Sequence, residues 1–186
     1  MTEPVLELRS ISKNFGANQA LDDVNLTVPH GSLIVLLGPA GAGKTTTLRI
    51  IAGLEAPSSG QVFIEGVDHT QHQPNQRDIA MIFDNLALYP NKNGFENIAS
   101  PLRIARRPKA EINQRVHEMA GLLKIDHILE RTPATFSGGE RQRVALGRAM
   151  IREPRFYLLD EPLSSLDFML RIDLRTELKR LQRESG

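Results

Sequence analysis

The sequence contains no cysteine among its 186 residues, which excludes a disulfide framework and any metal site built on thiolates. The absence of cysteine also fits a reducing compartment. Long apolar runs are missing as well, because none approaches the ~20 consecutive residues that a membrane-spanning helix needs. The first four residues show no basic region followed by an apolar one, so we expect no secretion signal there. Any connection to a membrane is therefore expected to go through another protein.

An excess of charge of one sign is also missing. The 23 Lys and Arg residues nearly balance the 22 Asp and Glu residues, which gives a formal net charge of +1. This balance argues against a broad basic surface for nucleic acid. The chain is 40% hydrophobic and 24% charged, an ordinary composition for a globular domain with a substantial core.

A glycine-rich segment, GPAGAGKT at residues 38–45, follows an apolar run at 33–37 that is typical of a buried parallel strand. The spacing G-x-x-x-x-G-K-[ST], followed by a helical stretch at 46–52, predicts a loop that holds a nucleoside triphosphate. Its backbone N–H groups can turn inward on phosphate oxygens. Lys44 can reach the β- and γ-phosphates, and the Thr45 hydroxyl can ligate Mg²⁺. The start of the helix would aim the positive end of its dipole at the same anion.

Two acids follow a second apolar strand, predicted at 155–159. In a phosphate-binding-loop protein, a strand-end aspartate such as Asp160 holds Mg²⁺ through hard oxygen contacts. The next carboxylate, Glu161, can orient and deprotonate the attacking water. The alternative is a strand that simply runs into an acidic turn.

Residues 137–140, Ser-Gly-Gly-Glu, open another predicted helix. Serine at the start and glutamate three residues later form a capping box, which is a complete structural explanation. The functional alternative uses the same geometry, since two glycines at a helix N-terminus expose N–H groups that can bind an anion.

The remaining pattern predicts an α/β fold in which a helical subdomain is inserted into a phosphate-binding-loop core. Alternating or apolar segments predict further strands at 5–8, 21–28, 61–66 and 79–83. Residues 94–150 are helical in pattern, with expected breaks at Pro101, Pro108 and Pro133, and a last helix is expected from about Phe168.

Residues 136–143, FSGGERQR, resemble the signature motif of ATP-binding-cassette (ABC) ATPases. Residues 159–167, LDEPLSSLD, resemble that family's Walker B and D-loop run, and the motif order is the same along the whole chain. Residues 86–98 look most like ATPase subunits of bacterial importers for sugars and related solutes, such as the maltose type. The resemblance implies a P-loop NTPase core with an antiparallel β subdomain at 1–88 and 151–186, and a helical subdomain at 89–150.

The same resemblance implies that two ATPase domains face each other head to tail and enclose two ATP molecules with Mg²⁺. Glu161 and Lys44 are then the catalytic residues, and Phe15 either stacks on adenine or is an ordinary, partly buried aromatic. The remaining implied nucleotide-binding residues are Gly38, Pro39, Ala40, Gly41, Ala42, Gly43, Lys44, Thr45 and Thr46 around the phosphates, Ser137, Gly138 and Gly139 against the γ-phosphate of the facing subunit, and Asp167 across the dimer seam. The implied metal ligands are Thr45, Asp84 and Asp160.

The sequence departs from the family pattern at three places. Asp84 stands where the family usually has glutamine, and its negative charge beside a triphosphate is expected to alter hydrolysis or coupling, unless it is a tolerated polar loop residue. Glu140 also replaces a more frequent glutamine, and we expect it to fold back onto the helix N-terminus. The family's histidine at the end of the next strand has no counterpart before Gly186, so we expect the fold to be C-terminally incomplete and the chain to be part of a longer protein.

These features predict a subunit that binds and hydrolyses ATP to energise import of a sugar or related small molecule across the bacterial cytoplasmic membrane. It is expected on the cytoplasmic face of the membrane, attached to transmembrane permease subunits and paired with a second ABC ATPase of the same or a different kind. A solute-binding protein is expected as an indirect partner, and no nucleic acid is expected. The alternatives are a soluble ABC ATPase that acts on nucleic acid or ribosomes, and a nucleotide-dependent clamp with impaired hydrolysis.

Overall fold

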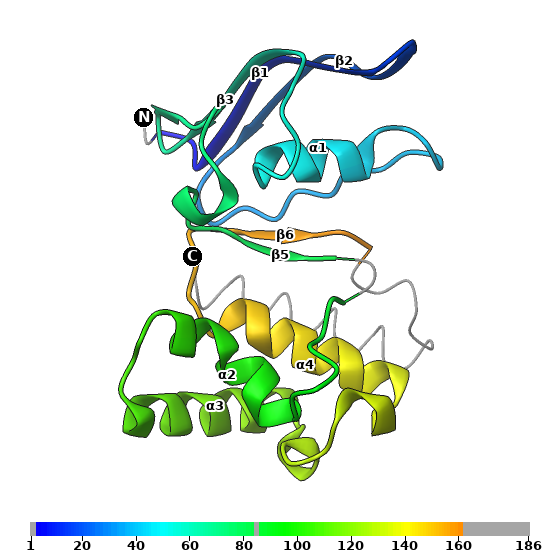
Figure 1. Cartoon of the computed structure of the whole chain (residues 1–186). Helices are drawn as coiled ribbons and strands as arrows, with labels where there is room; N and C mark the ends of the chain where they lie inside the picture. Colours follow the sequence, from blue (N-terminus) through cyan, green and yellow to red (C-terminus); the bar gives the residue numbers. More distant parts are fainter. Residues whose placement is uncertain (1–2, 84–85, 162–186) are drawn as a thin grey trace. The chain divides into compact units, whose positions relative to one another are not determined.

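The computed structural model describes residues 3–83 and 86–161. Within them the chain forms two compact units, of which the first ends at Ile79 and the second begins at Ala80 (Figure 1). Each unit has its own sheet and helices, which confirms the expected α/β class. The expected division into a core and a helical subdomain at 89–150 stays a prediction. The helix expected from Phe168 lies outside the described residues.

The first unit is built on a four-stranded antiparallel sheet with strand order β2-β1-β3-β4. The alternation of apolar and polar residues produces this sheet. In a strand every second side chain points to the same face, and the face of β1 and β3 that carries the apolar side chains is buried. Leu8, for example, is paired with Leu26 on one side and Val62 on the other. The strands are β1 (Leu6–Phe15), β2 (Asn18–Val28), β3 (Ser59–Ile64) and β4 (Val67–Asp68).

Helix α1 (Lys44–Ile51) belongs to the same unit, and its end is closed by a buried arginine. The Arg77 guanidinium is only 2% exposed and donates to the carbonyls of Ile50 at 2.8 Å and Ile51 at 2.9 Å. It also donates to the His72 carbonyl at 2.9 Å. Burial lowers the pKa of Arg77. The last carbonyls of an α-helix have no N–H partners within the helix, and the Arg77 cation supplies donors to these carbonyls of α1. A short 3₁₀ turn, η1 (Pro74–Gln76), directly precedes Arg77.

The predicted strand at 33–37 is wrong in this structure. No described residue pairs with this segment in a sheet, and all of its residues except half-buried Leu36 are exposed, with 65% of Val35 and 88% of Leu37 accessible. An apolar run forms a buried strand only when ladder partners lie on both sides of it. The sequence pattern reports the apolar run but not those partners.

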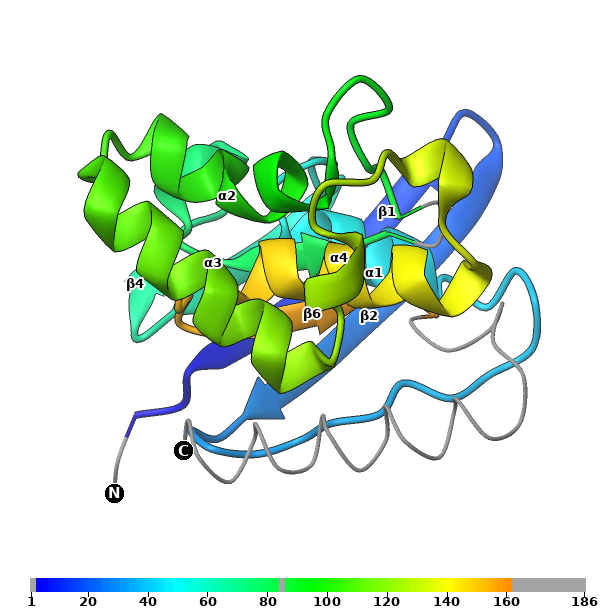
Figure 2. The same ribbon diagram turned by 90° about the horizontal axis from the view of Figure 1, so that it is seen from below.

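In its described part, residues 80–83 and 86–161, the second unit combines three helices with a parallel pair of short strands, β5 (Ala80–Ile82) and β6 (Tyr157–Leu159), in which Met81 pairs with Leu158. The helices α2 (Gly94–Ile104), α3 (Lys109–Leu123) and α4 (Gly138–Met150) pack against one another (Figures 1 and 2). Two 3₁₀ turns, η2 (Asp126–Ile128) and η3 (Pro133–Thr135), connect α3 to α4. The core of this unit is apolar and almost fully buried, and includes Ile98, Leu102, Ile112, Val116, Val144 and Leu146.

One of the three expected helix breaks is wrong. Pro108 directly precedes α3 and Pro133 begins η3, as expected, but Pro101 lies inside α2. Proline has no N–H for the carbonyl four residues earlier, which here belongs to Asn97. The Ser100 hydroxyl donates to that carbonyl at 2.8 Å and replaces the missing bond. The helix can therefore continue through the proline.

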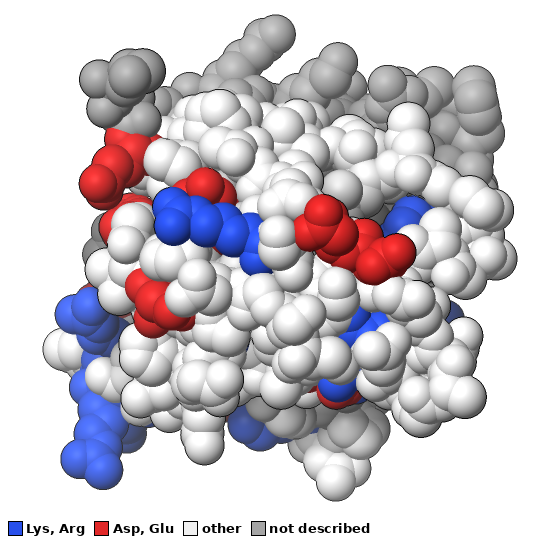
Figure 3. All heavy atoms as spheres, turned by 90° about the horizontal axis from the view of Figure 1, so that it is seen from above, with Lys and Arg blue, Asp and Glu red and all other residues white. Residues whose placement is uncertain are grey.

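None of the helices in residues 3–83 and 86–161 has the length and apolar character that a membrane crossing requires. Acidic and basic side chains are both present on the face shown in Figure 3, and neither sign forms a large continuous area there. This mixture agrees with the near balance of charge in the sequence.

Candidate functional site

The glycine-rich loop closes tightly before α1 because two of its glycines adopt left-handed backbone conformations. Gly41 has φ 81° and Gly43, the residue that caps α1, has φ 83°. A Cβ atom on Gly43 would lie 2.5 Å from Leu21 Cδ2 and 2.7 Å from the Ala20 carbonyl oxygen. Only glycine fits this position, so the sequence requirement at Gly43 has a direct structural cause.

The Lys44 side chain folds back over the start of the loop. Its ammonium donates to the carbonyls of Gly38 at 2.8 Å and Pro39 at 2.9 Å, while the Ala42 N–H donates to the Pro39 carbonyl at 3.2 Å. These bonds shape residues 38–44 into a closed loop with a cation held at its rim. Such a loop at a helix N-terminus suits an anion, because positive charge and the helix dipole act together.

The predicted phosphate-binding residues are all close in space in this loop and in the first turn of α1. Gly38, Pro39, Ala40 and Ala42 are exposed, Thr45 is exposed, and Thr46 is half-buried. The Thr47 hydroxyl instead donates to the Gly43 carbonyl at 3.0 Å and belongs to the helix. The hydroxyl oxygen of Thr45 is a hard ligand of the kind Mg²⁺ prefers, so the residues of this loop fit a magnesium-bound polyphosphate.

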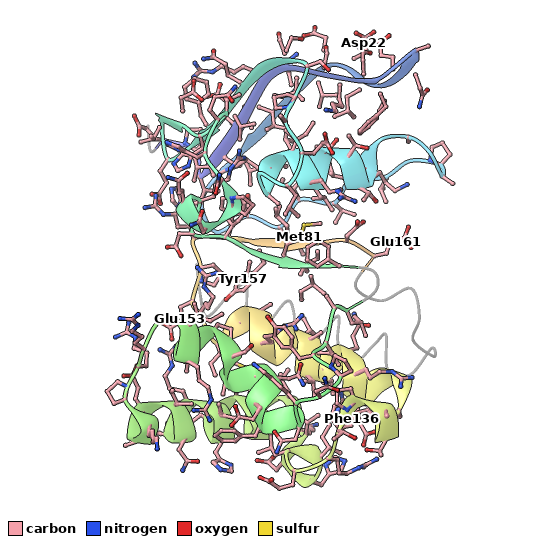
Figure 4. The ribbon with its side chains drawn as sticks, viewed as in Figure 1. Asp22, Met81, Phe136, Glu153, Tyr157 and Glu161 are labelled. Atoms are coloured by element: carbon pink, nitrogen blue, oxygen red, sulfur yellow. The ribbon has the colours of Figure 1, made fainter. Side chains whose placement is uncertain are left out.

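The two predicted acids lie at the end of β6, in the second unit (Figure 4). The Asp160 N–H continues the parallel pairing by donating to the Ile82 carbonyl at 3.0 Å, and Asp160 is 6% exposed. Glu161 has φ 46° and is exposed, so the chain turns sharply there. Consecutive carboxylates therefore have different surroundings: Asp160 is buried at the strand end, and Glu161 projects beyond it.

The signature segment forms the capping box that the sequence predicts. The Ser137 N–H donates to Glu140 Oε2 at 2.7 Å, and the Glu140 N–H donates to the Ser137 hydroxyl at 3.2 Å. His127 Nε2 and Arg131 Nη1 lie 3.2 Å and 3.6 Å from Glu140 Oε1. The bond from the Ser137 backbone is the largest cause of a lowered pKa of Glu140. The expected fold-back of Glu140 is confirmed, and exposed Gly138 follows Ser137 at the helix start.

The other predicted site residues are Phe15, Asp84 and Asp167. Phe15 ends β1 with 47% of its surface exposed, and Lys13 Nζ lies 4.9 Å from the centre of its ring. Asp84 and Asp167 lie outside the described residues. The structure therefore describes the phosphate loop within the first unit, and the signature cap and the acidic strand end within the second unit.

Sequence reasoning missed two residues, Asn97 and Arg148, that hold the segment between β5 and α2. Both do so through backbone atoms of that segment. Backbone partners leave no residue-type signature in a sequence, so no motif could have found them.

The comparisons with known proteins point to one family. Residues 21–164 match the family model described as ABC transporter. Among solved structures, the chain is similar to an ATP-binding cassette determined as a dimer in a post-hydrolysis state bound to ADP and Pi. That similarity has a TM-score of 0.87 and 30% sequence identity, and covers 97% of this chain and 84% of that one.

Three similar curated proteins are larger than this chain. The chain is 49% identical to the Fe(3+) ions import ATP-binding protein of Pectobacterium atrosepticum, over 96% of this chain and 51% of that protein. It is 49% identical to the trehalose/maltose import ATP-binding protein of Thermococcus litoralis, over 97% of this chain and 50% of that protein. It is 48% identical to an sn-glycerol-3-phosphate import ATP-binding protein of Rhizobium johnstonii, over 97% of this chain and 49% of that protein. The chain thus spans about half the length of these relatives.

Proposed function

The chain belongs to the ABC transporter family, and from this membership we propose that it is an ATP-binding and ATP-hydrolysing subunit that energises solute import. One observation carries the proposal: residues 38–44 close into a glycine-rich loop around the Lys44 ammonium at the N-terminus of α1. Such a loop offers backbone N–H groups, a cation and a helix dipole to a polyphosphate.

The chemistry proposed for this chain is mainly electrostatic positioning of the γ-phosphoryl group. Lys44 leaves its two carbonyl partners and contacts the β- and γ-phosphates, while Thr45 and Asp160 hold the magnesium ion. Mg²⁺, when bound, neutralises charge that develops on the phosphate oxygens. Glu161 orients the attacking water and accepts its proton, a role that suits an exposed carboxylate beyond a strand end.

The signature residues act on a second ATPase subunit in this proposal. Ser137, Gly138 and Gly139 open α4 with a capped N-terminus, and contact the γ-phosphate bound by the facing subunit. Asp167 lies across the seam and Phe15 stacks on adenine. The dimeric state of the similar cassette supports this arrangement. The second subunit is either a copy of this chain or a related ATPase.

We propose a sugar or related small molecule as the solute, delivered by a solute-binding protein and passed through transmembrane permease subunits. The similar proteins named for trehalose/maltose and for sn-glycerol-3-phosphate support this class, whereas the one named for Fe(3+) ions represents the competing class. The subunit would then bind the permease at the cytoplasmic face of the membrane. Asp84 is proposed to alter hydrolysis or coupling, and an unchanged rate and coupling in Asp84→Gln would remove that idea.

Phosphate release by the full-length chain with Mg·ATP tests the proposal. Glu161→Gln should lower the rate by at least about 100-fold while nucleotide still binds, since a general base contributes roughly 10²–10⁴-fold. Glu118→Gln, which changes a carboxylate on α3, is the matched control and should keep the rate. Binding without any release in the wild-type chain would support the clamp alternative, and release that is unchanged in Glu161→Gln would contradict the assigned base.

A further inference from the structure

The segment from Leu86 to Asn93, between β5 and α2, starts in an unfavourable backbone conformation. Leu86 has φ 57° and Ala87 has φ 43°, so two consecutive residues with a Cβ atom are left-handed. Only glycine adopts this conformation without steric cost, and other residues remain in it when surrounding contacts hold them.

Arg148, in the last turn of α4, makes those contacts. Its Nη1 donates to the Ala87 carbonyl at 2.7 Å and its Nη2 donates to the Leu86 carbonyl at 2.9 Å. The guanidinium also lies 5.3 Å from the centre of the Tyr89 ring. One planar fork therefore binds both left-handed residues and the aromatic that follows them, which a lysine ammonium could not reproduce. Burial lowers the pKa of Arg148, as expected for a cation removed from water.

Asn97, in the second turn of α2, fixes the other part of the segment. This residue is fully buried, accepts from the Tyr89 N–H at 2.8 Å and donates to the Tyr89 carbonyl at 3.1 Å. It also donates to the carbonyls of Lys92 at 2.9 Å and Asn93 at 3.0 Å. The two ends of the segment are thus held by different helices: Arg148 binds the first end from α4, the helix that Ser137 caps, and Asn97 binds the other end from α2.

We propose that Arg148 is a positioning residue that locks Leu86 and Ala87 in their left-handed conformation, and so fastens the start of the segment 86–93 to the signature helix α4. The lock makes residues 86–87 and α4 move as one body. Its effect on ATP turnover rests on the proposed function. Its effect on the backbone does not, because that effect follows from the contacts alone.

The backbone effect is tested first, by amide hydrogen exchange of the full-length chain without nucleotide. Arg148→Gln should speed exchange at residues 86–89 by at least about 10-fold, because the local structure opens more easily. Arg106→Gln, at an exposed arginine in the turn after α2, is the matched control and should leave that exchange unchanged. Ala87→Gly in the Arg148→Gln background should slow exchange again by about 3-fold or more, since glycine needs no lock in this conformation.

Turnover is tested with the same variants. Arg148→Gln should lower kcat by at least about 5-fold with less than about a 2-fold change in nucleotide affinity, because it alters positioning and not the phosphate loop. Adding Ala87→Gly to Arg148→Gln should restore at least half of the lost kcat. The single variant Arg148→Lys should have a kcat nearly as low as that of Arg148→Gln.

Failure to rescue by Ala87→Gly, or a lowered Tm with kcat unchanged, would overturn the positioning role. A wild-type chain that does not hydrolyse ATP would refute the proposed function instead. Hydrogen exchange would then decide whether Arg148 locks the segment.

Discussion

Substitution of Gly43 by alanine should damage the phosphate loop through two separable effects. The residue has φ 83°, which is unfavourable for alanine, and the added Cβ would lie 2.5 Å from Leu21 Cδ2 and 2.7 Å from the Ala20 carbonyl oxygen. The carbonyl belongs to the backbone of β2, so it cannot move aside as a flexible side chain can.

The structure contains a matched control for the first effect. Gly41 has nearly the same φ, 81°, but its added Cβ would have no heavy atom within 4 Å. Gly41→Ala should therefore cost only the left-handed conformation, about 1–2 kcal/mol. Gly43→Ala adds overpacking of about 1–3 kcal/mol, for a total of ~2–5 kcal/mol. This is a large share of the ~5–15 kcal/mol that stabilises a typical domain.

Urea unfolding of the full-length chain without nucleotide, followed by circular dichroism, measures both variants. We expect the midpoint to fall in the order wild type, Gly41→Ala, Gly43→Ala. Equal losses of unfolding free energy in the two variants would contradict this order, because the clash with β2 would then contribute nothing.

Three further outcomes are expected from unfolding measurements. Arg77→Met should lower the free energy of unfolding by about 2–4 kcal/mol, because buried carbonyls at the end of α1 lose their charged donor; an unchanged midpoint would contradict this. Ser100→Ala should cost about 1 kcal/mol by leaving the Asn97 carbonyl without a donor, and Pro101→Ala should remove that cost by restoring an N–H; a cost that persists would point to another cause. Glu140 has a pKa lowered from 4.5, so its ionised form stabilises the folded state above about pH 4.5 and this contribution is lost as the pH falls through the folded-state pKa. The stability difference between wild type and Glu140→Gln should therefore shrink in acid, and a difference independent of pH would exclude the role of the charge.

Local patterns in the sequence predicted much of this structure. Alternation located β1, β2 and β3 through the predicted segments 5–8, 21–28 and 61–66, but β1 continues to Phe15, β2 begins earlier at Asn18, and β4 was not predicted. The capping box of Ser137 and Glu140 follows from residue types three positions apart. The closed loop before α1 follows from glycine at Gly43, where no side chain fits. In each case the physical cause lies within a few neighbouring residues.

Features that depend on distant partners could not be predicted. The apolar run at 33–37 has the composition of a buried strand, but a strand also requires neighbours that composition does not specify. The buried guanidinium of Arg77 binds backbone carbonyls 26 and 27 positions away in the sequence. The guanidinium of Arg148 binds backbone carbonyls 61 and 62 positions away. Any residue offers a backbone carbonyl, so the sequence around the acceptor gives no sign of the contact. Pro101 is a different case, because its compensating donor is the neighbouring Ser100, but that bond forms only in the folded helix.

Calorimetric titration of Mg·ATP into the full-length chain measures whether residues 38–46 bind a polyphosphate. We expect a clear heat of binding for the wild-type chain. For Lys44→Ala we expect at least about a 10-fold weaker affinity, because a charge-assisted contact worth about 1.5–3 kcal/mol is removed. No heat with folded wild-type protein, or an equal affinity in Lys44→Ala, would contradict the assignment of residues 38–46 as a polyphosphate site.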